Sequence, residues 1–332
     1  MASITAYGAY VPTARAPLGE IQAFEGRPGR PRSKALATPA LDEDVLTMAW
    51  EAATQAIAGG STPAALITVT HSAPFGMRKL SRTLVRALDA IDDPEAVACY
   101  DLSGHQGSLL DAFQLAASLV DGGAGDVLVV VSDFVVSYED RVCDMLSAGG
   151  AAAFVVGTDG FAALGPVARE SKEVYDVWRL GTEPEVRYRM EVLFDGYLTT
   201  QKGALDKLAA ATGNAADSYG RVAVSQPHPQ TVRGLGKLGF TDAAMAGTVF
   251  VGDLGNMGAA SLGVSLALAF DGASAGQTVL AFGYGAGEGI AQEITVNAAP
   301  RASGIAELIA AGAPISLGTY YRWTRGRQQK PH

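Results

Sequence analysis

Three of the four histidines of this 332-residue chain stand where an α/β enzyme would place chemistry. His71 follows the apolar residues 65–70, His105 lies in the glycine turn 104–107, and His228 precedes a predicted helix. Ligands of such folds bind where strands end and helices begin. Imidazole titrates near neutral pH and can act as a general acid or base. No short His-x-His or His-x₃-His spacing is present, so we expect no metal site.

The turn that contains His105 belongs to an element that occurs twice. Residues 104–125 (GHQGSLLDAFQLAASLVDGGAG) align with residues 255–276 (GNMGAASLGVSLALAFDGASAG) without a gap. Each copy is typical of a glycine turn, an apolar helix and then a buried strand. His105 is matched by Asn256, and both stand at helix N-termini, where free N–H groups and the helix dipole favour negative charge. The repeat predicts a duplicated chain with an active centre shared by its two halves.

The elements around this repeat alternate between strands and helices. Strands are expected at residues 3–11, 65–70, 96–100, 127–131, 151–156, 222–224, 248–251 and 278–282. Helices are expected at 41–58, 79–90, 197–211 and 230–238, whereas 23–40, 167–196 and the glycine-rich 281–289 are expected to lack regular structure. The alternation predicts a mainly parallel sheet covered by helices.

Composition excludes several classes of protein. A hydrophobic content of 48% and a mean hydropathy of +0.16 allow a large core. The net charge is −9 and the basic residues are scattered, which argues against a nucleic-acid surface. No apolar run is long enough to span a membrane. The two cysteines, Cys99 and Cys143, suit a reducing cytoplasm, so we expect a cytoplasmic protein.

Six strings carry a resemblance to a known family. They are ITAYGAYVP, ALDEDVLTMAWEAA, YDVWR, LGNMGAAS, FGYGAGEG and YYRWTRGR. The chain resembles the thiolase superfamily, within it the ketoacyl-synthase III and HMG-CoA synthase branch, and above all the archaeal-type HMG-CoA synthases. The resemblance covers nearly the whole chain. It implies an α/β protein with a thiolase-like five-layer αβαβα fold, built from two duplicated half-domains, and a tight homodimer.

The resemblance also suggests a division of the chain and a set of catalytic positions. We expect an N-terminal half at residues 1–165, a connector at 166–196, a C-terminal half at 197–300 and a docking tail at 301–332. The family's nucleophilic cysteine corresponds to His105, or to Gln106 if the register shifts by one residue. Its acid/base glutamate corresponds to His71. Its catalytic histidine corresponds to Ser225, whereas a ketoacyl-synthase register selects His228.

Loss of the cysteine changes what the site can do. A Claisen condensation through an acyl-enzyme needs a thiolate, and imidazole cannot hold a stable acyl thioester. The retained Asn256, the helix N–H groups and the loop of Gly283 and Gly285 could still stabilise an oxyanion. Trp178 and Arg179, in YDVWR, lie in a segment that resembles a CoA-facing part of the family, and we expect them to bind CoA.

Three functions remain open at this point. The first is an acyl-CoA-dependent, C–C bond-forming acyltransferase, acting alone or as a subunit. The second is a lyase that performs an aldol or retro-aldol step without a covalent intermediate. The third is a non-catalytic subunit that docks through YYRWTRGR onto a cysteine-bearing thiolase-like homologue or a small zinc-ribbon/OB-fold protein. The expected ligand is an acyl-CoA or acyl-carrier thioester, bound as substrate, with no tightly bound cofactor, nucleic acid or membrane.

Overall fold

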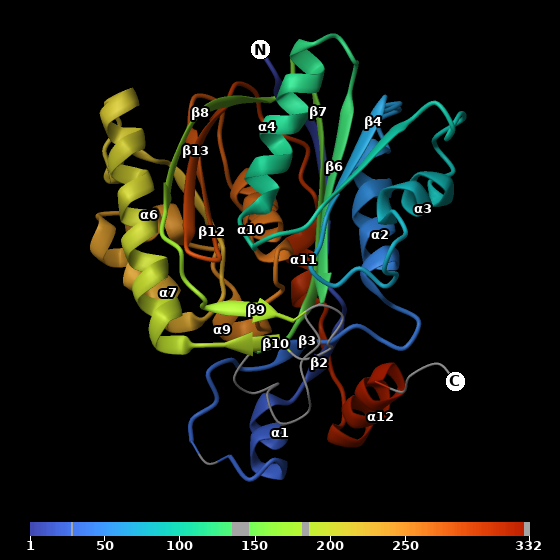
Figure 1. Cartoon of the computed structure of the whole chain (residues 1–332), viewed down its shortest axis with the longest axis vertical. Coiled ribbons are helices and arrows are strands. Elements are labelled where there is room, and N and C mark those ends of the chain that lie inside the picture. The colour runs from blue at the N-terminus through green and yellow to red at the C-terminus, as the bar shows by residue number, and fades with distance from the viewer. Residues whose placement is uncertain (28, 135–145, 181–185, 329–332) are drawn as a thin grey trace.

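A computed structural model describes residues 1–27, 29–134, 146–180 and 186–328, with no side chains described beyond residue 324. Its layers are stacked as predicted: two layers of strands enclose a central pair of helices, and other helices cover both outer faces (Figure 1). The central pair consists of α4 (Ser108–Asp121) and α10 (Ala260–Asp271). These are the two copies of the repeated element. The five-layer αβαβα arrangement is confirmed.

The first half contributes five strands, and outer helices cover them. The strands are β1 (Ser3–Tyr10), β4 (Ala65–Val69), β5 (Ala98–Leu102), β6 (Val127–Phe134) and β7 (Gly149–Gly157). The outer helices are α2 (Val45–Ile57) and α3 (Leu80–Ala87). Acidic residues precede α2, and Asp44 caps it by accepting a hydrogen bond from the Thr47 N–H.

The second half repeats this plan with one strand fewer. Its strands are β8 (Ala162–Ser171), β11 (Arg221–Val224), β12 (Thr278–Gly285) and β13 (Glu288–Val296). Its outer helices include α6 (Met190–Thr212), α7 (Pro229–Gly234) and α8 (Asp242–Met245). The strand predicted at 248–251 is the one that the second half lacks. Instead, the N–H groups of Phe250 and Val251 donate to the Gln226 side chain, and α9 (Val251–Leu254) follows.

All nine strands belong to one continuous sheet, in the order β11-β12-β13-β8-β1-β7-β6-β4-β5. Pairing of β1 with β8 joins the halves. The prediction of a mainly parallel sheet is wrong, because in this sheet only β4–β5, β4–β6 and β11–β12 pair in parallel among the described residues. The predicted irregular stretch 281–289 is a hairpin. Ala286 and Gly287, both with positive φ, form the two-residue turn between β12 and β13.

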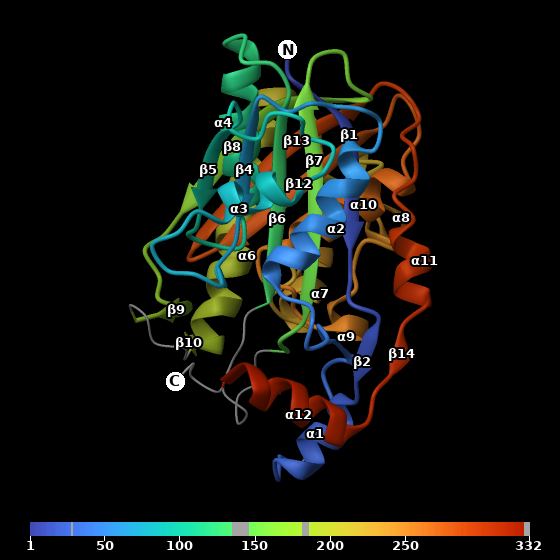
Figure 2. The same cartoon turned by 90° about the vertical axis from the view of Figure 1, so that its right-hand side faces the viewer.

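The predicted irregular stretch 167–196 is also largely regular. It contains the end of β8, the hairpin of β9 (Val177–Arg179) and β10 (Val186–Tyr188), and the first turns of α6. A small sheet of β2 (Ala14–Ala16), β3 (Leu36–Ala37) and β14 (Ala313–Pro314) lies below the main one. The remaining helices are α1 (Leu18–Phe24), α11 (Ile305–Ala310) and α12 (Leu317–Gln328), the last beside α1 (Figure 2).

Close packing of the central layer gives a testable prediction. A Cβ on Gly263 of α10 would lie 2.5 Å from Cγ1 of Val131 and 2.9 Å from Cβ of Ala152. We expect Gly263→Ala to lower the free energy of unfolding by about 1–3 kcal/mol, as overpacking does. Gly252→Ala in α9 is the matched control, because no atom lies within 4 Å of its added Cβ. Equal urea midpoints for the two variants would contradict this packing.

Candidate active site

A pocket of about 180 Å³ lies where the turns before α4 and α10 meet. Among the predicted site residues, those that line it are His71, His105, Trp178, Arg179, Asn256 and Gly285. His228, Ser225 and Gly283 are not among its lining residues. Gln106, Ser147, Asp176 and Tyr284 also line it. The volume suits an acyl group with its thioester rather than a whole CoA molecule.

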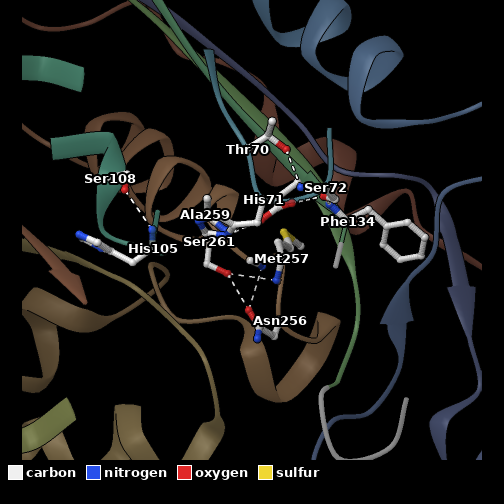
Figure 3. A network of polar contacts seen from close by, with 12 residues as sticks. Thr70, His71, Ser72, His105, Ser108, Phe134, Asn256, Met257, Ala259 and Ser261 are labelled. Atoms are coloured by element: carbon white, nitrogen blue, oxygen red, sulfur yellow. Dashed lines mark hydrogen bonds and ion pairs between the residues drawn. The ribbon is translucent and has the colours of Figure 1, made fainter. Parts of the chain in front are cut away.

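His71 forms a buried pair with Asp133. The two residues follow Val69 and Val131, which are partners in the parallel pairing of β4 and β6, so the sheet brings them side by side. Nδ1 of His71 lies 3.1 Å from Oδ2 of Asp133, which is fully buried. That carboxylate also accepts hydrogen bonds from the Ser72 hydroxyl and, at 2.9 Å, from the Ala259 N–H (Figure 3). Asp133 therefore fixes the orientation of the His71 ring.

Formation of the His71–Asp133 pair shifts the pKa of both side chains. Burial alone would lower the pKa of His71, but the charge and hydrogen bond of Asp133 outweigh it and raise that pKa above its ordinary value. Burial alone would raise the pKa of Asp133, but His71 and its other donors hold it below its ordinary value. His71 is thus a cation below its raised pKa and a neutral base above it, with Nδ1–H kept on Asp133.

His105 lines the pocket, but its ring is turned out of the centre. Nδ1 accepts a hydrogen bond from the Gly107 N–H at 3.0 Å, and Nε2 lies 2.9 Å from Oε2 of Glu288. Glu288 is also paired with Arg169 at 3.1 Å. Figure 3 shows the ring pointing away from Asn256 and His71. Because the Gly107 N–H needs a lone pair on Nδ1, Nε2 of His105 carries the proton and donates to Glu288.

Asn256 is held rigidly and presents a free donor. Its main chain bonds to Leu146 and Ala148, and its Oδ1 accepts from the Gly258 N–H at 2.9 Å and from the Ser261 hydroxyl at 3.4 Å (Figure 3). Its Nδ2 makes no hydrogen bond to any residue that the structure describes. Asn256 can therefore donate to a ligand oxygen in the pocket, which is what an oxyanion site needs.

The side chains of His228 and Ser225, the other two catalytic candidates, form hydrogen bonds that stabilise the local fold. Nδ1 of His228 caps α7 by accepting from the Gln230 N–H at 3.1 Å, and its Nε2 lies 2.8 Å from the Arg32 guanidinium. Burial, together with the charges of Arg32 and Arg233, lowers the pKa of His228 to about 4. The Ser225 hydroxyl is fully buried and accepts from the Tyr284 N–H. Neither side chain reaches the pocket.

Gly283 and Gly285 bring β12 against the turn before α4. A Cβ on Gly285 would lie 2.5 Å from the Gln106 nitrogen and from Cβ of His105. A Cβ on Gly283 would lie 3.2 Å from Cα of Gly107. The absence of side chains at these positions therefore allows the close approach that shapes the pocket wall.

Trp178 and Arg179 stand at the pocket on the hairpin of β9 and β10. Trp178 packs edge-on against Tyr175, with ring centroids 6.1 Å apart, and the Arg189 guanidinium lies 5.7 Å from its ring centre. The exposed Arg179 forms no ion pair within the described part of the chain. Its positive charge nevertheless disfavours the cationic form of His71 and so lowers the pKa of that side chain.

Two acidic residues of the site escaped the sequence analysis. Asp133 is the penultimate residue of β6 (VLVVVSDF) and stands two residues past the strand predicted at 127–131, so a polar residue just beyond a predicted strand was the signal that could have found it. Asp176 is nearly fully buried and accepts the hydroxyl hydrogen of Tyr284 at 2.5 Å. Among the described residues, no group of histidine, cysteine, aspartate and glutamate side chains could hold a metal ion.

Comparison with other proteins places the chain in a family. No protein-family model matches it. It is 30% identical over 325 residues to the hydroxymethylglutaryl-CoA synthase of Aeropyrum pernix, across 92% of this chain and 88% of the relative. It is 25% identical over 315 residues to the enzyme of the same name from Methanocaldococcus jannaschii, across 90% of this chain and 89% of the relative.

Solved structures agree on the fold. An HMG-CoA synthase complexed with CoA matches with a TM-score of 0.83 at 15% identity, over 97% of this chain and 89% of that chain. A priming β-ketosynthase matches with a TM-score of 0.78 at 20% identity, over 91% of this chain and 97% of that chain. None of the helices described here is both long and apolar enough to cross a membrane. The chain belongs to the hydroxymethylglutaryl-CoA synthase family.

Proposed function

We propose that this protein makes or breaks a carbon–carbon bond beside a thioester carbonyl by an aldol-type step, without an acyl-enzyme intermediate. The observation that carries the proposal is the His71–Asp133 pair, which presents an imidazole to the same pocket as the free Nδ2 of Asn256. A base held by a carboxylate and a nearby amide donor are the two groups that such a step requires.

In the cleavage direction, neutral His71 accepts the proton of the 3-hydroxyl group of a 3-hydroxyacyl thioester. The C2–C3 bond breaks, C3 becomes a carbonyl carbon, and the electron pair moves to C2 to form a thioester enolate. Asn256 Nδ2 stabilises the enolate oxygen, and His71 returns the proton that it accepted to C2, which gives the acyl thioester and a neutral imidazole. The addition of an enolate to a ketone is the same step in reverse.

Among the described residues, the position of Cys99 supports a route without an acyl-enzyme. Cys99 is buried within β5, next to the outer helix α3, and is not a pocket residue. Cys143 lies outside the described residues. His105, at the position that corresponds to the family's nucleophile, is committed to Gly107 and Glu288. With no thiol in the pocket among the described residues, the carbon–carbon chemistry proposed here runs by proton transfer.

The substrate would be a thioester of CoA or of an acyl-carrier protein. Solved relatives include an HMG-CoA synthase complexed with CoA and the curacin HMG synthase in complex with an acetyl donor-ACP. We infer that Trp178 and Arg179, on the exposed hairpin at the pocket, contact the CoA portion. Gly283 and Gly285 would let the acyl end approach the α4 turn. In the reverse direction the enolate of the acyl thioester adds to a ketone and the thioester bond stays intact; net acyl transfer would need a separate cleavage of the C–S bond.

The homodimer expected from the sequence has a suitable surface. β5 is the edge strand of the nine-stranded sheet, and Tyr100 in it is exposed. Phe75 and Met77, in the preceding loop after β4, are also exposed. An unpaired strand edge with apolar neighbours suits pairing with a second copy. Docking of another subunit through YYRWTRGR would have to use the outer face of α12, because Tyr320 and Tyr321 are buried.

The test is turnover combined with intact mass. Pure protein is incubated with 3-hydroxy-3-methylglutaryl-CoA and related 3-hydroxyacyl-CoA thioesters, and the released carbonyl product is measured. Separately, the mass of the protein is recorded after incubation with acetyl-CoA. We expect turnover with no gain in mass. A stable acetyl adduct would contradict the route without an acyl-enzyme, and no C–C turnover in either direction would contradict the function.

A further inference from the structure

The hairpin of β9 and β10 forms part of the pocket wall but lies outside the main sheet (Figure 1). Its two strands pair with each other in a separate two-stranded sheet. Its apolar side chains, Val177, Val186 and Tyr188, form a small cluster apart from the three large cores. Among the described residues, neither pairing with the main sheet nor a shared core therefore fixes this hairpin, although its Trp178 and Arg179 line the pocket.

A buried hydrogen bond joins the start of the hairpin to β12. The Tyr284 hydroxyl donates to Oδ2 of Asp176 at 2.5 Å, and both residues are only 1% exposed. Such a short O–H···O distance is typical of a carboxylate acceptor. Burial and the neighbouring Asp176 raise the pKa of Tyr284, so its hydroxyl keeps the proton that it donates. Asp176 is thus tied to the core of the second half.

Tyr284 is a rigid anchor for this bond. Its ring packs against the ring of Tyr197, with centroids 5.0 Å apart, and its N–H donates to the Ser225 hydroxyl at 3.1 Å. Gly196 of α6 leaves room for the Tyr284 hydroxyl, because a Cβ at that position would lie 2.7 Å from it. The ring and the main chain of Tyr284 are already ordered by the core, so little further entropy is lost when its hydroxyl holds Asp176.

Asp176 in turn organises the residues around Trp178. Its Oδ1 accepts a hydrogen bond from the Val177 N–H at 2.7 Å, and its main-chain carbonyl accepts one from the Arg189 N–H at 2.7 Å. The Arg189 guanidinium lies 5.7 Å from the centre of the Trp178 ring. Tyr175, which directly precedes Asp176, packs edge-on against the same ring. Both groups that contact Trp178 are therefore attached to the chain beside Asp176.

We propose that Asp176 is a positioning residue for CoA recognition: its hydrogen bond to Tyr284 holds the hairpin where Trp178 and Arg179 contact the CoA portion of the thioester. This inference rests on the proposed function, in which these two side chains bind CoA. Asp176 has no part in proton transfer, since both of its carboxylate oxygens already accept hydrogen bonds. Without the bond to Tyr284, the hairpin occupies the binding position for only a fraction of the time, and the apparent affinity for CoA falls by that fraction.

The experiment measures the binding of two thioesters that differ in the CoA portion. Acetyl-CoA is titrated by calorimetry, and S-acetyl-N-acetylcysteamine, which has the acetyl thioester but no nucleotide, is titrated by ligand-observed NMR. Asp176→Ala and Tyr284→Phe should each raise the Kd of acetyl-CoA by about 10-fold, the scale of one hydrogen bond, and leave the Kd of the truncated thioester unchanged. The double variant should bind acetyl-CoA no more weakly than the single variants, because all of them remove the same bond.

Tyr197→Phe is the matched control. The Tyr197 hydroxyl is also buried and donates to the Ser225 carbonyl at 2.8 Å, but Tyr197 is not a pocket residue. This change removes a hydrogen bond of the same kind without releasing the hairpin, so we expect the wild-type Kd. Asp176→Asn should restore most of the affinity, because its amide can accept from the Val177 N–H and donate to the Tyr284 hydroxyl.

Wild-type affinity of Asp176→Ala and Tyr284→Phe for acetyl-CoA, or equal weakening of both thioesters, would overturn the proposal. A lack of acetyl-CoA binding by the unmodified protein would overturn it as well. The proposed function is judged by its own assay. C–C turnover with unchanged affinities refutes only this inference, and the expected change in Kd without C–C turnover refutes only the aldol step.

Discussion

Replacing His71 with asparagine is expected to lower kcat/KM for a 3-hydroxyacyl thioester by about 10²–10⁴-fold, the usual contribution of a positioned general acid or base. Asparagine cannot accept and return a proton, but its amide can still donate to Asp133, so the fold should persist. The measurement is steady-state release of the carbonyl product, with a urea midpoint for each variant to check folding.

The matched control is His105→Asn. Its ring contacts Gly107 and Glu288 and points away from Asn256, so we expect a smaller loss than for His71. A larger loss at His105 would show that His105, rather than His71, is the catalytic base. For the wild type, cleavage should rise with pH through an apparent pKa above the ordinary value of about 6.5, because Asp133 raises the pKa of His71.

Replacing Asp133 with alanine is expected to lower the free energy of unfolding by about 3–5 kcal/mol, the usual cost of breaking a buried ion pair. The change removes the partner of His71 and leaves the Ala259 N–H and the Ser72 hydroxyl without their acceptor. The measurement is urea unfolding at pH 6. Combining this change with His71→Asn should cost less than the sum of the two single changes, because they share one interaction.

The pH dependence follows from the directions of the two pKa shifts. The pKa of Asp133 is lowered, so its contribution is present above the ordinary value of about 3.9 and is lost as the pH falls through the lowered pKa. The pKa of His71 is raised, so its contribution is present below about 6.5 and is lost as the pH rises through the raised pKa.

The difference in stability between wild type and Asp133→Ala should therefore be largest between about pH 4 and 6.5. It should shrink at higher pH, where His71 is neutral and the carboxylate keeps only hydrogen bonds from uncharged donors. A difference that is the same at pH 6 and pH 9 would mean that the ion pair is not its cause.

The amino-acid sequence by itself determined the duplication and hence the fold class. The two copies at 104–125 and 255–276 repeat their glycines. At the ends of the copies, the matched Gly125 and Gly276 both have positive φ, the conformation that glycine adopts without strain. Apolar runs indicated β4 and β6, and His71 stands two residues after the end of β4. These features depend on neighbours in the chain, which a sequence displays directly.

Strand and loop predictions failed where distant residues compete for the backbone. Residues 248–251 have the apolar character of a strand, but the Gln226 side chain accepts hydrogen bonds from the N–H groups of Phe250 and Val251. Residues 281–289 look like a loop because of their glycines, but Ala286 and Gly287 make a hairpin turn and β13 pairs on both sides, with β12 and β8. Long-range pairing outweighed local propensity in both cases.

The chemistry of the site was decided by tertiary structure. His71, His105 and His228 look alike in the sequence, as imidazoles near strand ends or helix starts. In the folded protein, His71 pairs with the buried carboxylate of Asp133 on β6. His105 contacts Glu288 of β13, and His228 contacts Arg32 and caps a helix. Each partner lies far from its histidine in sequence, so tertiary packing, within the first half for His71 and between the halves for His105 and His228, determines which imidazole faces the pocket as a base.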